Sequence, residues 1–194
     1  MSYILKDPFL GEQPITNLDT IGPGPVNLVS GVYGGFDSFY NTESRGYDIN
    51  LGMGTFLYCR YSGTIVAGTV VELTPTITAG LIITSATAWA GTAVTGKPLA
   101  VAVAPTGAVG QWGWFQIQGN SITTVQGAPV AGNPVYWQAA GIVSATPVVS
   151  KQMVNAQFAT AVSVTVGQGT TAVVLSATQA VVYLNRPFAQ GAIT

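Results

Sequence analysis

A regular alternation of apolar and polar side chains runs through the stretch VNAQFATAVSVTV, residues 154–166. The apolar residues recur at every second position, which is the periodicity of a β-strand with one buried face and differs from the 3.6-residue period of a helix. Thr160 is the one polar interruption of the apolar face. A chain with this pattern has to pair its strands and cover one side of them. The residues predicted to face the core are Val154, Ala156, Phe158, Val162, Val164 and Val166.

Similar strand patterns recur along most of the chain. Short apolar stretches such as 55–62, 99–103 and 135–144 are separated by turn-forming residues, at a spacing of about eight to twelve residues that is typical of all-β domains. The last strand is expected to end at Pro187, because proline cannot donate a hydrogen bond to a sheet. This organisation predicts an all-β domain over residues 51–194, either a β-sandwich or a jelly-roll-like barrel.

The stretch QWGWFQIQG, residues 111–119, has bulky apolar side chains on both faces of one expected strand. Phe115 and Ile117 share one face and are predicted to fill the core. Trp112 and Trp114 share the opposite face, so either a second layer within the chain covers them or another molecule does. We expect these two tryptophans to cover a subunit or capsid contact, or the second face of a barrel closed in the oligomer, and Trp114→Ala to weaken assembly more than folding.

Residues 1–50 differ from the rest of the chain. They are acidic, contain the turn-prone stretch GPGP, and carry several aromatic side chains, among them Phe36, Phe39 and Tyr40. Proline and glycine disfavour long regular elements, whereas aromatic residues are rare in plain disordered segments. The composition favours an extended arm whose aromatic side chains dock on a partner. A loop-rich part of the same domain is the other interpretation.

Charged side chains are scarce. Lys, Arg, Asp and Glu make up 7% of the residues, compared with about 25% in a typical soluble domain. The six Lys and Arg residues are scattered, whereas a nucleic-acid site needs them clustered, so no nucleic-acid partner is expected. No stretch approaches the roughly 18 apolar residues of a membrane helix, and no signal peptide is recognisable, so no membrane association is expected.

The residue types needed for catalysis or metal binding are largely missing. The chain has no histidine, which excludes Ser-His-Asp chemistry and histidine metal sites. Cys59 is the single cysteine and is interpreted as a buried, inert thiol. Asp37, Glu43 and Asp48 lie close in sequence but lack EF-hand spacing, and we interpret them as a solvated loop with an ion pair to Arg45. No catalytic residue, metal or cofactor is therefore expected.

Two further sequence patterns are each compared with a known type of binding site. GTAVTGKP, residues 91–98, matches the first seven positions of a phosphate-binding loop. Pro98 stands where that motif needs Ser or Thr, and a strand rather than a helix is expected to follow, so we interpret the stretch as a hairpin turn. The four tryptophans could instead line a sugar site, although such residues more often anchor a core or an interface. They are Trp89, Trp112, Trp114 and Trp137.

Four stretches in this order resemble a known group of proteins: GKPLAVAVAPTGAVGQWGWFQIQG, NPVYWQAAGIVS, KQMVNAQFATAV and VVYLNRPFAQGAIT. Over about residues 55–194 the chain is similar to the head-decoration, or cement, proteins of tailed bacteriophages, most of all those of podovirus-like genomes. The resemblance implies a homotrimer on the outer capsid surface that clamps neighbouring subunits of the major capsid protein against internal DNA pressure. It also implies assembly in the host bacterial cytoplasm, with which a single cysteine agrees. The candidate interface residues are Trp112, Trp114, Trp137, Phe36, Phe39, Tyr40, Arg186 and Phe188.

A second function class remains open from the sequence. The chain could be a head-fibre or tail adhesin module that binds host surface glycans through exposed tryptophans. An enzyme is the third class, and no constellation of residues supports it.

Overall fold

A computed structural model describes residues 4–5, 43–78, 81–91, 96–104 and 106–191 of the 194-residue chain. Within these residues the regular structure consists of β-strands and one short 3-10 turn, η2 (Gly169–Thr171). The predicted all-β fold is confirmed. Eleven strands form one sheet, and two further pairs form small two-stranded sheets.

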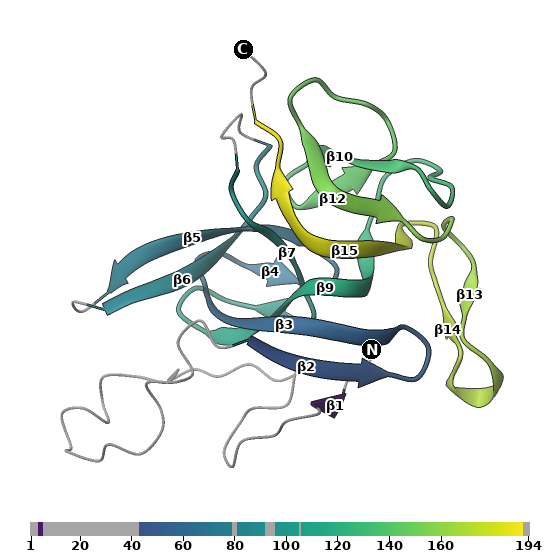
Figure 1. Cartoon of the computed structure of the whole chain (residues 1–194), viewed down its shortest axis with the longest axis horizontal. Helices are drawn as coiled ribbons and strands as arrows, with labels where there is room; N and C mark the ends of the chain where they lie inside the picture. Colours follow the sequence, from purple (N-terminus) through teal and green to yellow (C-terminus); the bar gives the residue numbers. More distant parts are fainter. Residues whose placement is uncertain (1–3, 6–42, 79–80, 92–95, 105, 192–194) are drawn as a thin grey trace.

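The first half of the sheet closes on itself (Figure 1). Strand β3 pairs with β6 in parallel and with β9 in antiparallel orientation. Strand β5 lies between β6 and β7, and β7 returns to β9. These pairings make a closed ring, the first ring, in which every strand has two neighbours. Its strands are β3 (Gly52–Tyr61), β5 (Val70–Thr78), β6 (Leu81–Ala88), β7 (Leu99–Ala102) and β9 (Trp112–Thr124).

The interior of the first ring is filled by one hydrophobic cluster. Because a ring of five strands is narrow, small residues such as Ala100 and Ala102 line it beside larger ones. The rings of Tyr61 and Phe115 pack with their centroids 4.8 Å apart. Ile65, from a two-stranded sheet of β4 (Ile65–Val66) and β8 (Thr106–Gly107), also joins this cluster. The predicted core positions Phe115 and Ile117 are both buried here.

The second half of the sheet forms a second ring that shares β9 with the first. Strand β15 pairs with the C-terminal part of β9, β12 pairs with β15, and β10 lies between β12 and β11. A bridge between Val125 and Val143, directly after β9, brings β11 back to the shared strand. The remaining strands of this second ring are β10 (Pro134–Ala139), β11 (Ile142–Ser144), β12 (Gln152–Phe158) and β15 (Gln179–Ala189).

Two more clusters complete the core. One lies within the second ring and against the first, and contains Leu99, Val101, Phe158 and Val182. The other contains both tryptophans of β9 and is joined by valines of a small hairpin, β13 (Thr165–Val166) and β14 (Val173–Val174). Figure 1 shows this hairpin beside the turn that connects β2 and β3.

The alternation over residues 154–166 is confirmed, but the strand is not continuous. The predicted core side chains are buried or half-buried, whereas Asn155, Gln157, Ser163 and Thr165 are exposed. Strand β12 ends at Phe158, and residues 159–164 connect it to the hairpin. One alternating sequence therefore contributes side chains to two separate hydrophobic clusters.

The prediction that the last strand ends at Pro187 is wrong. Strand β15 continues to Ala189. Pro187 falls where the pairing with β12 shifts register, between the Val154–Phe188 and Ala156–Leu184 pairs. At such an irregularity the missing N–H of proline removes no ladder hydrogen bond.

The N-terminal segment is described only in part. Strand β1 (Ile4–Leu5) pairs with β2 (Glu43–Asp48), and β2 pairs with β3 at the edge of the sheet. Residues 6–42 lie outside the described residues, as do Phe36, Phe39, Tyr40 and Asp37. The extended arm and the domain boundary at residue 50 stay predictions.

Candidate functional site

Trp112 and Trp114 lie inside the chain, which corrects the expectation that they contact another subunit. Trp114 is fully buried and Trp112 is 7% exposed. The ring of Tyr58, from the neighbouring strand β3, packs 5.1 Å from that of Trp114 and 5.8 Å from that of Trp112. Residues of the chain itself cover this face of β9, because Leu175 and the valines of the β13–β14 hairpin belong to the same hydrophobic cluster.

The other two tryptophans also lack an open ring face that could serve as a sugar platform. Trp89 is 1% exposed. Trp137 is half-buried, and its indole N–H donates to the carbonyl oxygen of Trp89 at 3.1 Å. Lys151 Nζ lies 3.9 Å from the centroid of the Trp137 ring, and Gly91 packs so closely that a Cβ there would lie 2.4 Å from the indole. The proposed glycan site built from exposed tryptophans is not formed.

Two of the remaining candidate interface residues lie at the irregular part of β15. Arg186 is exposed and has a positive φ of 48°. Phe188 is half-buried and pairs with Val154. Their side chains are accessible to different degrees, and their interface role stays a prediction.

Cys59 and Asp48, two titratable residues for which no catalytic role is expected, are both buried. Cys59 is buried in the first ring, and burial raises the pKa of its thiol far above the ordinary value, so the reactive thiolate is suppressed. Asp48 is 5% exposed, and its Oδ1 accepts hydrogen bonds from the backbone N–H groups of Asn50 and Leu51 at 2.8 and 3.0 Å. The expectation of a solvated Asp48 is therefore wrong, because it holds the β2–β3 turn.

The stretch that resembles a phosphate-binding loop carries an ion pair instead. Lys97 Nζ lies 2.5 Å from a carboxylate oxygen of Glu72, whose other oxygen accepts a hydrogen bond from the Ala90 N–H. Residues 92–95 are outside the described part, and β7 follows as a strand rather than a helix. Among the described residues, no group of three or more Cys, Asp or Glu side chains is placed to hold a metal ion.

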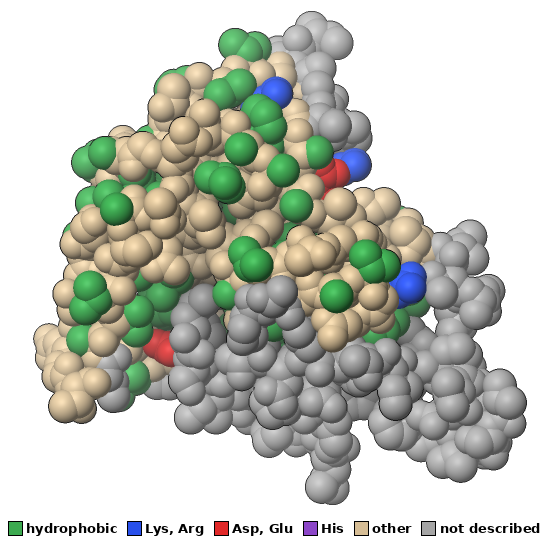
Figure 2. All heavy atoms as spheres, turned by 180° about the vertical axis from the view of Figure 1, so that it is seen from behind, with side chains coloured by type: hydrophobic (Ala, Val, Ile, Leu, Met, Phe, Trp, Pro, Cys, Tyr) green, Lys and Arg blue, Asp and Glu red, His purple; other side chains and the backbone are tan. Residues whose placement is uncertain are grey.

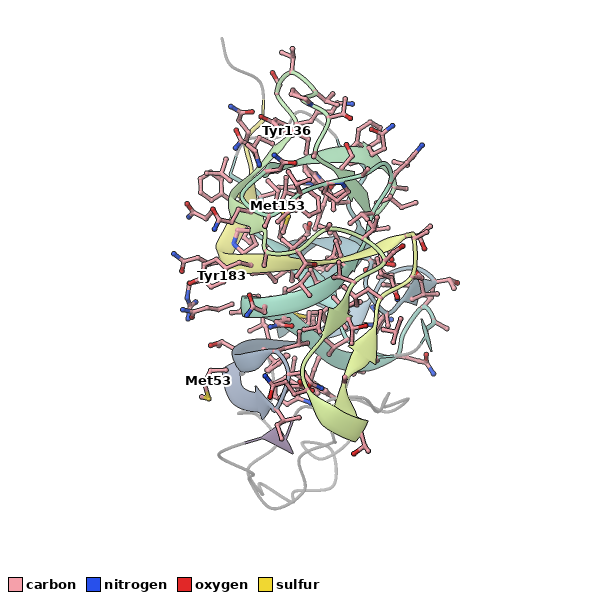
Figure 3. All side chains as sticks on the ribbon, turned by 90° about the vertical axis from the view of Figure 1, so that its right-hand side faces the viewer. Met53, Tyr136, Met153 and Tyr183 are labelled. Carbon is pink, nitrogen blue, oxygen red and sulfur yellow. The ribbon has the colours of Figure 1, made fainter. Side chains whose placement is uncertain are left out.

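A groove lies on the surface where β3, β9 and β15 meet. Its volume is about 350 Å³. Met53 and Tyr183 stand at its rim, 47% and 42% exposed, and Figure 3 shows both projecting from the same side of the molecule. The lining residues are Met53, Gly54, Thr55, Gln118, Gly119 and Tyr183.

The floor of the groove depends on close backbone contact between β3 and β9. A Cβ on Gly119 would lie 2.2 Å from the carbonyl oxygen of Met53, and Gly119 has a φ of 94°. Directly beside it, the register between β3 and β9 shifts after Thr55. Gln116 Nε2 donates to the carbonyl oxygens of Gln118 and Asn120 at 3.1 and 3.0 Å, which fixes the irregular backbone.

This groove was not among the sites expected from the sequence. Its lining residues come from three separate parts of the chain, so no local motif contains them. The one available signal is the placement of Tyr183 on the polar side of the alternation in β15, between the buried Val182 and Leu184.

The chain shows little similarity to known proteins. No protein-family model and no curated protein matches the chain. Among solved structures, the chain is similar to the one described as "The crystal structure of head fiber gp8.5 N base in bacteriophage phi29", with 8% sequence identity and a TM-score of 0.44 over 69% of this chain and 95% of that chain. Similarity at this level establishes neither a shared fold nor a shared function. Within the described residues, no helix has the length and hydrophobicity to cross a membrane.

Proposed function

We propose that the chain is a structural virion protein, which binds the outer surface of a phage capsid and holds neighbouring major capsid protein subunits together. The observation that carries this proposal is the near absence of charge from the described surface. In Figure 2, few charged side chains are visible, two of them side by side, and most of the coloured surface is neutral polar or apolar. Interfaces between proteins are depleted of charged residues at their centres, so this surface suits contact with protein.

The fold supports a mechanical role. The two rings share β9, which pairs with β3, β7 and β15 along its length; strand pairing closes the first ring, and the Val125–Val143 bridge closes the second. A load applied to one ring is therefore transmitted to the other through continuous backbone pairing. A cement protein needs this property, because it has to resist the separation of the subunits that it connects.

The described chemistry supports contact rather than catalysis. Glu72 is buried in an ion pair, Asp48 holds a turn, and Cys59 is inside the first ring. Each of these groups has a structural role that accounts for its position. The proposal that the chain is not an enzyme rests on these placements.

The decisive experiment is the copy number of the chain in purified virions, measured by quantitative mass spectrometry relative to the major capsid protein. A one-to-one ratio, or another simple fraction set by the capsid lattice, is the expected result. Absence from virions would overturn the proposal. A few copies per particle would favour a head-fibre or tail adhesin.

A second experiment separates cementing from mere attachment. Particles with and without the chain are heated, and DNA release is followed with a fluorescent dye. Release at a lower temperature from particles that lack the chain is expected. Equal release temperatures would contradict a cementing role even if the copy number is high. The mass of the purified chain in solution tests the proposed homotrimer.

A further inference from the structure

We propose that the groove between Met53 and Tyr183 binds a neutral saccharide. This site goes beyond the proposed virion function, and it differs from the tryptophan site that the sequence suggested. Four features of the groove support this site: the tyrosine at its rim, its polar atoms, its uncharged lining and the backbone surface at Gly54 and Gly119.

The rim provides a surface for an apolar sugar face. Tyr183 lies on β15 with 42% of its surface exposed, while its neighbours Val182 and Leu184 are fully buried. The anchored strand therefore fixes the backbone position from which this exposed ring projects. An aromatic ring with a hydroxyl at one end offers both an apolar face and a polar tip. Met53, which lines the same groove and projects from the same side of the molecule as Tyr183 in Figure 3, adds an adaptable apolar contact.

The polar atoms of the groove are oriented and available. Thr55 Oγ1 donates to Gln118 Oε1 at 3.4 Å, which directs the amide so that its Nε2 group remains to donate. Neither that Nε2 nor the Tyr183 hydroxyl has a hydrogen-bond partner among the described residues. Amide and hydroxyl groups both match the donor and acceptor pattern of sugar hydroxyls.

Neutral side chains continue beyond the groove. Asn185 pairs across the sheet with Gln118, and Gln157 pairs with Tyr183. Both amide side chains are exposed. A ligand that extends out of the groove along these strands would meet further amides, which favours an oligosaccharide over a single sugar.

The charge and size of the groove argue against other ligands. None of its lining residues is charged, whereas phosphate and nucleic-acid sites rely on Lys and Arg. Its volume of about 350 Å³ is at the small end of the range for small-molecule sites, roughly 300–1,000 Å³. A protein partner needs a surface of about 1,000 Å² or more, which a groove of this size does not supply alone.

The glycine floor allows a ligand to reach the backbone. Gly54 and Gly119 line the groove with backbone atoms, and an added Cβ would meet the Phe56 ring at Gly54 and the carbonyl oxygen of Met53 at Gly119. The close β3–β9 backbone contact at Gly119 holds the two strands that line this part of the groove at a short separation. A preformed site of this kind loses little conformational entropy when it binds a ligand.

The test uses the full chain and four neutral probes: maltotriose, cellotriose, triacetylchitotriose and lactose. Saturation-transfer NMR and calorimetry measure binding up to about 10 mM, the range expected for weak saccharide sites. We expect saturable binding of at least one probe. Tyr183→Ala is expected to weaken it about tenfold or more, which corresponds to about 1.4 kcal/mol, and Tyr183→Phe to retain most of it. Gln118→Leu is expected to weaken it as well.

Tyr136→Ala serves as the matched control, because Tyr136 is a half-buried tyrosine of β10 that does not line the groove. It is expected to leave the affinity unchanged. The absence of saturable binding of all four probes, or equal binding by the folded Tyr183→Ala variant, would overturn the proposal. If Tyr183→Ala instead reduces capsid binding or self-association while no probe binds, the groove is a protein contact. Virion copy number is measured separately, so either proposal can fail alone.

Discussion

Gly119 on β9 packs directly against the carbonyl oxygen of Met53 on β3, where a Cβ atom would lie at 2.2 Å. This contact joins the shared strand to the rim of the groove. Gly119 also has a φ of 94°, in a region of backbone conformation that other residues rarely adopt. Two independent constraints therefore require glycine at this position.

Gly119→Ala is expected to lower the free energy of unfolding by about 2–4 kcal/mol, because both backbone strain and overlap with a rigid backbone atom oppose it. Gly127→Ala is the matched control. Gly127 has a φ of 85° and nothing within 4 Å of a Cβ, so this variant measures the strain alone and is expected to lose about 1 kcal/mol. Urea denaturation gives both values. Equal losses for the two variants would show that the contact with Met53 is not constraining.

Trp114→Ala is expected to destabilise folding by about 3–5 kcal/mol, because it removes a fully buried ring from the cluster around Tyr58 and leaves a cavity. This replaces the sequence-based expectation of a mainly assembly-related effect. Val149→Ala, at a side chain that is 88% exposed, is the control and is expected to stay within about 0.5 kcal/mol of the wild type. An unchanged unfolding free energy for Trp114→Ala, together with weaker assembly, would restore the interface interpretation.

Lys97→Met is expected to lower the free energy of unfolding by about 1–3 kcal/mol. The substitution leaves the Glu72 carboxylate, with a side chain 8% exposed, without its cation. The loss is smaller than for a fully buried pair, because Lys97 is 31% exposed and solvent screens the interaction.

A double-mutant cycle with Glu72→Gln isolates this coupling. The double variant is expected to recover part of the loss, since no unpaired carboxylate remains. Lys151→Met, which removes the cation beside Trp137, controls for the loss of a lysine. Strictly additive effects of Lys97→Met and Glu72→Gln would show that the ion pair contributes nothing.

Stability is expected to fall as the pH rises above about 9. Burial raises the pKa of Cys59 above its ordinary value of 9.0. Burial is also the larger cause that raises the pKa of Tyr61 above 10.0, and the negative charge of a Cys59 thiolate is the smaller one. Below pH 9 both groups are protonated in the folded and unfolded states. Above it the unfolded chain releases protons that the folded chain keeps, so each group lowers stability by up to about 1.4 kcal/mol per pH unit.

Denaturation midpoints between pH 7 and 11 measure this loss, and Cys59→Ala is expected to reduce its slope between pH 9 and 10. The same burial predicts that a thiol reagent modifies Cys59 only in the unfolded chain. Rapid modification under native conditions would contradict the burial of Cys59.

Much of the fold could be predicted because a strand with one buried face alternates apolar and polar residues along the sequence. The alternation over residues 154–166 identifies the buried side chains even though the strand is interrupted. In β9, the same reasoning correctly assigns Phe115 and Ile117 to the core. It does not say what covers Trp112 and Trp114, because that depends on which strand lies opposite.

Pro187 and the groove illustrate the same limit. A proline normally ends a strand, yet the register shift between β12 and β15 accommodates it. The groove combines Thr55, Gln118 and Tyr183, which are brought together only by pairing of β3, β9 and β15. The register between two distant strands cannot be predicted from the sequence of either strand alone.

The sequence by itself determined that this chain is all β, that it is poor in charge, and that it lacks histidine chemistry, because composition and side-chain period are local properties. The tertiary structure decided that the sheet closes into two rings around one shared strand, which tryptophans are buried, and where a neutral groove opens. Those outcomes depend on long-range pairing and on the packing of distant side chains into limited space, and no stretch of the chain encodes either of them on its own.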